Sequence, residues 1–176
     1  MKRTMKKIGI LALAFFAFAA CNKEDQTGSM TVRMTDAPGD YLEVNVDIVK
    51  VGLKYEDDDF MYDLPTETGI YNLLELQNDV SVVIAEDEDI PVGDLQEIRL
   101  ILGTHNSIVV EDEGTFDLFV PSGYTSGIKI KVKERVENNE VVDILLDFDA
   151  EKSIVKNGNG DYHLKPVIHI KELYTE

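Results

Sequence analysis

The sequence predicts an all-β domain: an antiparallel β-sandwich of immunoglobulin-like or transthyretin-like type, with at most one or two short helical turns. Short runs rich in valine, isoleucine and aromatic residues are separated by glycine, aspartate, asparagine and proline, as in strands joined by turns. These runs recur at spacings of about 8 to 15 residues, which suits a sandwich. The chain has no long stretch with apolar residues at helical spacing. We expect a single domain over residues 29–176.

The clearest strand pattern runs from Val44 to Ile48, where apolar and polar residues alternate. The alternation changes phase after Val49, which predicts a β-bulge. The best candidates for helical turns are residues 73–76 and 150–153. In chain order, the predicted strands cover residues 29–35, 44–53, 60–64, 70–76, 80–85, 97–102, 107–110, 116–120, 127–132, 141–148 and 167–174.

The N-terminus has the pattern of a bacterial lipoprotein signal peptide. Residues 1–7 contain four basic side chains and no acid, residues 8–20 are an unbroken apolar run, and Phe18-Ala19-Ala20-Cys21 closes it. The apolar run has 13 residues, fewer than the roughly 20 of a membrane-spanning helix. We therefore expect a leader over residues 1–20 and a lipidated Cys21 that anchors the chain in a membrane. The alternative is an ordinary secreted protein in which Cys21 is a free thiol.

A polar segment over residues 21–28 follows the leader and is predicted to be a tether. Its residues Lys23, Glu24 and Asp25 resemble the signal that sends lipoproteins of Bacteroidetes-type bacteria to the outer face of the outer membrane. We expect an outer membrane lipoprotein exposed at the cell surface. A periplasmic orientation, with the segment acting only as a spacer, is the alternative.

The charge balance is strongly acidic. The chain has 17 basic and 34 acidic residues, and removing the leader leaves 13 basic residues and a net charge of −21. Such a surface repels phosphate backbones and anionic headgroups, so we expect no nucleic-acid partner and no membrane contact beyond the anchor. It attracts divalent cations or basic partners, although solubility alone also explains it. One cysteine permits no internal disulfide, so packing must hold the fold.

One predicted strand has a basic outer stripe. Ile128, Ile130 and Val132 alternate with three lysines, Lys129, Lys131 and Lys133, as in a strand buried on one face. We expect the lysines to pair across the sheet with acids of residues 141–147. The functional alternative is an anion-binding ridge.

Four aspartates at predicted strand ends are candidate calcium ligands: Asp36, Asp40, Asp147 and Asp149. Calcium takes six to eight oxygen ligands, which two loops can supply if they meet at one end of a sandwich. The structural alternative is favoured, because aspartate caps turns and helix N-termini, and Asp149 precedes the possible turn at 150–153.

Other acidic segments also have simpler structural explanations. Residues 157–161, Asn-Gly-Asn-Gly-Asp, resemble the start of a calcium loop but better suit a tight hairpin turn. The acidic runs 56–59, 86–89 and 111–113 are predicted to be solvated loops, with a low-affinity cation surface as the alternative.

Motifs for catalysis are weak. No Gly-x-Ser-x-Gly elbow is present, and His105, His163 and His169 lack the closely spaced partners that a zinc site needs. Carboxylate pairs are abundant, but the chain has no tryptophan to act as a sugar platform in a glycosidase. We expect a protein that is not an enzyme.

Six segments form a recognisable series along the chain. They are Thr35-Asp36-Ala37-Pro38, Tyr71-Asn72-Leu73-Leu74, Ile98-Arg99-Leu100-Ile101-Leu102-Gly103, Val120-Pro121-Ser122-Gly123, Leu146-Asp147-Phe148-Asp149-Ala150 with Ser153, and residues 158–168. In this order they resemble the bacterial family called domain of unknown function 4382, and the resemblance runs from about Met30 to Ile170. It implies a secreted or lipid-anchored β-rich module; the family has no established activity and so no catalytic residues to transfer.

Together these features predict a lipid-anchored, non-enzymatic module of the cell envelope that binds a surface glycan or a protein partner, without a required cofactor. A calcium-stabilised, adhesion-like module is the first alternative. A hydrolase that uses a carboxylate pair is the second.

Overall fold

The computed structural model describes residues 26–37, 39–121 and 126–176. The predicted leader, Cys21, Lys23, Glu24 and Asp25 lie outside these residues. In the described part of the chain, no helix has the length and apolar character needed to cross a membrane.

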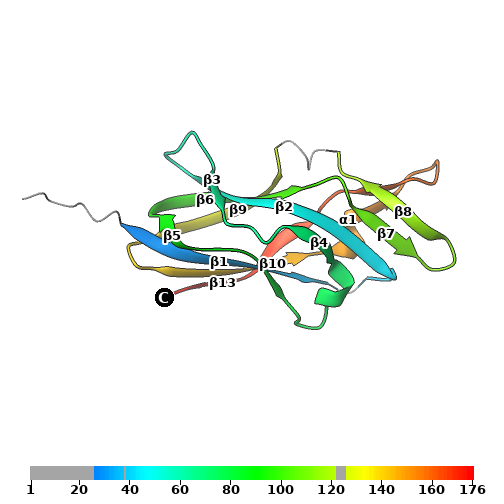
Figure 1. Ribbon diagram of the computed structural model, residues 1–176, viewed down its shortest axis with the longest axis horizontal. Helices are drawn as coiled ribbons and strands as arrows, with labels where there is room; N and C mark the ends of the chain where they lie inside the picture. The colour runs from blue at the N-terminus through cyan, green and yellow to red at the C-terminus, as the bar shows by residue number, and fades with distance from the viewer. Residues whose placement is uncertain (1–25, 38, 122–125) are drawn as a thin grey trace, which may run out of the picture.

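The described chain folds into two β-sheets with two short helical turns (Figure 1). The elements are β1 (Thr27–Asp36), β2 (Glu43–Tyr55), β3 (Tyr62–Leu64), β4 (Gly69–Asn72), the 3-10 turn η1 (Leu73–Leu76), β5 (Val82–Pro91), β6 (Gly93–Leu102), β7 (Ser107–Val110), β8 (Gly114–Phe119), β9 (Ile128–Val136), β10 (Val141–Phe148), the helical turn α1 (Ala150–Ser153), β11 (Ile154–Lys156), β12 (Tyr162–Leu164) and β13 (Ile168–Thr175).

The smaller sheet has the strand order β13-β10-β1-β5, and the larger has the order β11-β12-β8-β7-β2-β6-β9, with β3 and β4 also paired to β2. Most neighbours are antiparallel, which confirms the predicted sandwich. Two pairs, β1 with β10 and β12 with β8, are parallel. Strand periodicity carries no information on partner direction, so the sequence did not reveal these two pairs.

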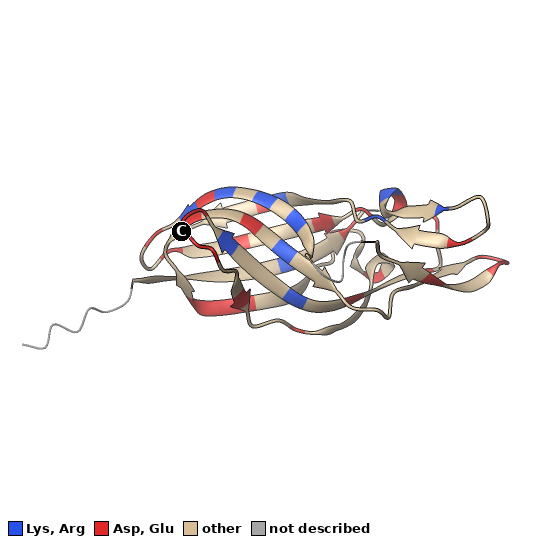
Figure 2. Cartoon of the chain, turned by 90° about the horizontal axis from the view of Figure 1, so that it is seen from above, with Lys and Arg blue, Asp and Glu red and all other residues tan. Residues whose placement is uncertain are grey.

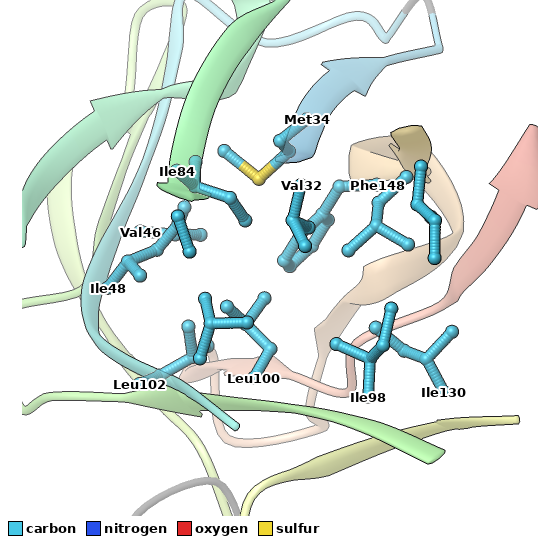
Figure 3. Packing of buried hydrophobic residues seen from close by; sticks show 14 of the residues in the cluster. Val32, Met34, Val46, Ile48, Ile84, Ile98, Leu100, Leu102, Ile130 and Phe148 are labelled. Carbon is cyan, nitrogen blue, oxygen red and sulfur yellow. The ribbon is translucent and has the colours of Figure 1, made fainter. Parts of the chain in front are cut away.

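The core lies between the two sheets (Figure 3). Val32 and Met34 of β1 and Phe148 of β10 are fully buried from one side, and Ile48 of β2 and Leu100 of β6 are fully buried from the other. Burying each such side chain contributes about 1.5 to 3 kcal/mol. With no disulfide between described residues, this packing supplies the main stabilising free energy.

Several local predictions are confirmed. The register of β2 against β6 shifts between Ile48 and Lys50, where the sequence predicts a bulge. Residues 157–161 form the turn of the β11–β12 hairpin, in which the Asn157 N–H donates to the Asp161 carbonyl at 2.8 Å. Both predicted helical turns form. The strand β1 begins at Thr27, so the last two residues of the predicted tether belong to the sandwich.

Two predictions are wrong. Residues 86–89 are part of β5 and not a loop; this strand lies at the edge of the smaller sheet, where charged side chains are tolerated and discourage pairing with other chains. The lysine stripe of β9 does not face the acids of β10, because β9 pairs with β6 and β10 pairs with β1 and β13. The turn between β9 and β10 carries the chain from one sheet to the other.

Candidate functional site

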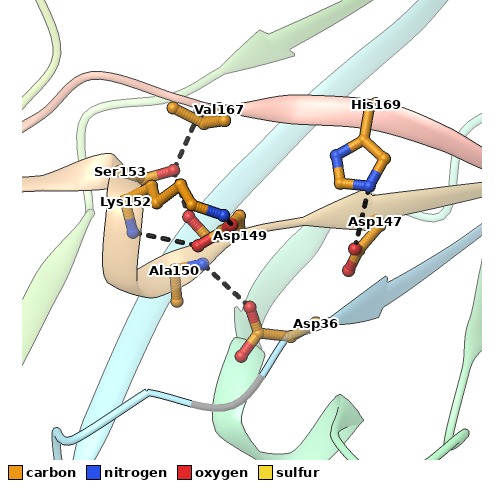
Figure 4. A network of polar contacts seen from close by, with 8 residues as sticks. All are labelled: Asp36, Asp147, Asp149, Ala150, Lys152, Ser153, Val167 and His169. Atoms are coloured by element: carbon orange, nitrogen blue, oxygen red, sulfur yellow. Dashed lines mark hydrogen bonds and ion pairs between the residues drawn. The ribbon is translucent and has the colours of Figure 1, made fainter.

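Three of the four predicted aspartates meet where β1 and β10 end. The two strands are parallel neighbours, with Asp36 in register with Phe148 and Thr35 with Asp147, so Asp36, Asp147 and Asp149 come together (Figure 4). Asp40 does not join them: it is exposed, and its carboxylate forms no hydrogen bond or ion pair within the described residues. We call Asp36, Asp147, Asp149 and Ser153 the polar junction.

Every member of the polar junction has a partner inside the protein. Asp36 Oδ1 accepts from the Ala150 N–H at 2.9 Å. Asp149 is the N-cap of α1, and its Oδ1 accepts from the Lys152 N–H at 2.9 Å. The hydroxyl of Ser153 donates to the Asp149 carbonyl and accepts from the Val167 N–H at 2.8 Å. Asp147 Oδ2 lies 3.1 Å from His169 Nε2 on the neighbouring strand β13.

The pKa values of the two buried acids move in opposite directions. Desolvation raises the pKa of Asp36 to about 6, and the nearby charges of Asp147 and Asp149 add to that rise. Desolvation also acts to raise the pKa of Asp149, but hydrogen bonds from Lys152 outweigh it, so the pKa lies below its usual value. Burial therefore favours the neutral form of Asp36, whereas the hydrogen bonds from Lys152 favour the charged form of Asp149.

These contacts agree with the capping explanation of the acidic motifs. Asp36 and Asp149 satisfy the amide groups at the start of α1, which have no partner within the turn. In the described residues, no group of three or more histidine, cysteine, aspartate or glutamate side chains is arranged to hold a metal ion.

A second feature is an open groove of about 900 Å³ at the far end of the sandwich from the start of β1 (Figure 1). We call it the distal groove. It lies on the outer face of the larger sheet, because Asp117 and Phe119 alternate with the core residues Leu118 and Val120 along the chain. Its lining residues are Ile70, Thr104, His105, Asn106, Ser107, Phe116, Asp117, Leu118, Phe119, Asp161, Tyr162 and His163.

One wall of the distal groove is the loop between β6 and β7, and the nearly buried carboxylate of Asp47 fixes its position. Asp47 Oδ2 accepts from the His105 N–H at 3.1 Å and lies 3.2 Å from His105 Nδ1. A Cβ on Gly103 would overlap the same oxygen, so a larger residue there would displace the carboxylate that holds the loop.

The side chain of Asn106 holds this loop from beneath. It accepts from the Asp47 N–H at 2.9 Å and donates to the Gly103 carbonyl at 2.7 Å. Asn106 is 2% exposed, whereas the His105 side chain is 79% exposed. The loop is therefore anchored from below and presents an imidazole to solvent.

Another part of the groove lining is aromatic. Phe119, which is 54% exposed, packs edge-on against His163 with ring centres 5.5 Å apart. Beneath them, Phe116 and Tyr162 lie with ring centres 4.9 Å apart. The parallel pairing of β8 with β12 brings these residues together, with Phe119 in register with His163.

The distal groove combines an exposed apolar ring with carboxylate, amide, hydroxyl and imidazole groups, as ligand sites do. The groove was not predicted from the sequence. The available signal was the phase of Phe119, which is apolar yet alternates with core positions. The position of Phe119 in the pattern does not reveal which strand pairs with β8.

The fold and groove place the protein in a class: it is an all-β sandwich domain with an open groove on the outer face of its larger sheet. The chain belongs to the family described as Domain of unknown function (DUF4382), whose model matches residues 27–166. No curated protein matches the chain significantly, and no solved structure does. The matched range includes both the polar junction and the distal groove.

Proposed function

We propose that this protein is a lipid-anchored, non-enzymatic module of the cell envelope that binds a surface glycan in the distal groove. The observation that carries the proposal is the half-exposed ring of Phe119 against His163, in a groove that is also lined by polar groups of the loop around His105. A sugar ring has an apolar C–H face and a rim of hydroxyl groups. The groove offers an aromatic surface for the first and hydrogen-bonding side chains for the second.

The position of the groove suits display from a membrane. The six residue-to-residue steps from Cys21 to Thr27 span at most about 20 Å, so a lipid on Cys21 would hold the start of β1 close to the bilayer. The distal groove lies at the other end of the sandwich (Figure 1). This arrangement leaves the groove accessible to an extracellular ligand if the domain faces outward.

A protein partner is the second candidate for the groove, since Ile70 is 59% exposed at its edge and adds apolar surface. A hydrolase has less support. Asp117 and Asp161 both line the groove, but both are exposed, and a general acid normally needs burial to raise its pKa. The calcium-stabilised alternative also has less support, because Asp36 and Asp149 already accept hydrogen bonds from the protein.

Glycan-array binding with the chain from residue 21 carrying Cys21→Ser tests the glycan proposal. We expect Phe119→Ala to weaken binding at least about tenfold, as loss of an aromatic contact of 1.5 kcal/mol or more would. Phe60→Ala is the matched control, because Phe60 is 86% exposed but lies in the β2–β3 loop. Equal loss in both variants, or no glycan bound by the parent chain, contradicts the proposal.

The anchor is tested separately in cells. We expect Cys21→Ser to move the protein from the membrane fraction to the soluble fraction, and protease added to intact cells to remove the wild-type domain. A membrane-bound Cys21→Ser variant argues against lipidation. Protection from protease argues against surface exposure.

A further inference from the structure

The basic residues of this acidic protein gather on one face. Of the 13 basic residues outside the leader, seven lie on β2, β6 and β9, where they alternate with core residues and so point away from the core. Figure 2 shows them as blue segments on neighbouring strands, in the half of the molecule nearer the start of β1. We call them the basic strip: Lys50, Lys54, Arg99, Lys129, Lys131, Lys133 and Arg135.

Neighbouring acids neutralise only part of the basic strip. Lys50 pairs with Asp63 at 2.8 Å, Arg99 with Glu97 at 3.2 Å and Arg135 with Asp94 at 3.0 Å. The other four basic side chains form no ion pair with any described residue: Lys54, Lys129, Lys131 and Lys133.

The register of the strands explains the excess of positive charge. Glu97 lies opposite both Lys54 on β2 and Lys131 on β9, so one carboxylate stands among three cations. Lys129 lies directly opposite Arg99. Like charges in facing positions destabilise a sheet. The basic strip therefore holds positive charge that the fold itself does not use.

Protection of a sheet edge explains only part of this pattern. β9 is an edge strand of the larger sheet, and lysine discourages edge strands from pairing with other chains. Lys50 and Lys54, however, lie on β2, which has paired strands on both sides. Their placement extends positive charge across the face of the sheet and away from its edge.

Acids surround the end of the sandwich that the tether reaches. Thr27 contacts Asp89 at 3.3 Å, and Asn139 bonds to Thr27 in the turn that carries Glu137 and Glu140. This end would meet an anionic bilayer first and would be repelled by it. The basic strip lies on the side of the molecule, which favours a ligand that runs along the domain.

The basic strip and the distal groove share the outer face of the larger sheet. Strand β2 crosses both, with Asp47 supporting the groove and Lys50 three residues further on. A polymer that lies along β2 would therefore contact both regions. We propose that the basic strip binds a carboxylated polysaccharide, such as a polyuronate, whose chain also occupies the distal groove; this inference rests on the glycan-binding function proposed above.

Binding of polygalacturonate and neutral dextran to the chain from residue 21 with Cys21→Ser tests the inference. We expect polygalacturonate to bind and to weaken at least about tenfold between about 0.05 M and 0.5 M salt, since screening acts on exposed charges. Lys129→Gln, Lys131→Gln and Lys133→Gln together should weaken binding at least about tenfold. The triple change Arg33→Gln, Lys152→Gln and Lys171→Gln, at residues outside the groove lining, is the matched control for net charge and should stay within about twofold.

Thermal melting establishes that both triple variants fold. No binding of polygalacturonate, equal binding of dextran, or an equal loss in the two triple variants overturns the inference. Equally tight binding to phosphatidylglycerol vesicles also overturns it and assigns the strip to lipid headgroups.

The two proposals fail in different ways. If the Lys129, Lys131 and Lys133 changes abolish polygalacturonate binding and Phe119→Ala leaves it intact, the basic strip stands and the groove proposal fails. If Phe119→Ala abolishes binding of a neutral glycan and no polyuronate binds, the groove stands and the basic strip proposal fails.

Discussion

The polar junction around Asp36 and the distal groove around Phe119 are both built at strand ends, but one is closed by the protein and the other is open to solvent. In the polar junction, Asp36, Asp149 and Ser153 are buried and their polar atoms meet partners of the chain. In the distal groove, Phe119 and the side chain of His105 are largely exposed. Similar residue types are buried in the first region and exposed at the surface in the second.

The segments that resemble the family contain the whole polar junction but only part of the distal groove. The segments that carry the family resemblance include Asp36, Asp149 and Ser153, and the structure assigns these residues to the capping of α1 and the attachment of β13. Of the groove residues, Phe119, His105 and Asp117 lie outside these segments, whereas Asp161, Tyr162 and His163 lie within residues 158–168. Gly103 belongs to one of these segments, residues 98–103, and also supports the distal groove. Its lack of a side chain makes room for Asp47 beneath the loop between β6 and β7.

Stability against pH gives the largest expected contrast. Asp36 keeps its proton up to about pH 6 when the chain is folded and loses it near pH 4 when unfolded. Between those values the folded state binds more protons, so the Asp36 contribution to the free energy of unfolding falls as pH rises. The rise in the Asp36 pKa corresponds to a loss of at most about 3 kcal/mol in the free energy of unfolding.

Asp36→Asn removes this charge and keeps an oxygen for the Ala150 N–H. We expect the variant to be more stable than the wild type by about 2 kcal/mol at pH 7, with the difference vanishing near pH 4. Urea unfolding across this range measures it. Asp40→Asn, at an exposed position, should follow the wild type; a matching gain there would mean that the effect reflects overall charge and not the polar junction.

A pair of serines compares the two regions directly. Ser153→Ala removes the acceptor of the Val167 N–H and the donor to the Asp149 carbonyl and should lower the free energy of unfolding by about 2 kcal/mol. Ser107→Ala, in the distal groove, removes only a long contact with Asn45 at 3.3 Å and should change it by less than about 0.5 kcal/mol. Equal losses in urea unfolding would remove the distinction between a sealed and an open region.

The cap of α1 gives the smallest expected effect. Asp149→Ala removes the acceptor of the Lys152 N–H and should cost about 1 kcal/mol, whereas Asp149→Asn keeps an N-cap oxygen and should recover most of that. The lowered pKa of Asp149 means that its contribution is present at neutral pH and is lost as pH falls through the folded pKa. Thermal melts measure these effects, and Asp161→Ala, at the groove rim, should leave the melting temperature unchanged.

Local chemistry allowed much of the fold to be predicted. Alternation identified strands such as β7 and β10 at their observed bounds, the phase shift after Val49 located the bulge in β2, and the Asn-Gly repeats marked the β11–β12 turn. Each depends on residues within one strand or turn, so neighbouring letters carry the information. The capping action of Asp149 was predicted for the same reason.

Partners across the sandwich could not be predicted in this way. The lysines of β9 were expected to face the acids of β10, which follow them in the chain, yet a turn between the sheets separates the two strands. The wall of Phe119 and His163 exists only because β8 and β12 run in parallel. Such pairings join distant residues and depend on how whole sheets pack.

By itself, the sequence determined an acidic, disulfide-free, strand-rich domain of the DUF4382 kind, because composition, alternation and turn residues act locally. The tertiary structure decided which side chains share a face. It closed the aspartates of β1 and β10 around α1, opened a groove beside Phe119 and collected seven basic residues on β2, β6 and β9. The physical reason is that strand register and sheet order bring together residues that are far apart in the chain.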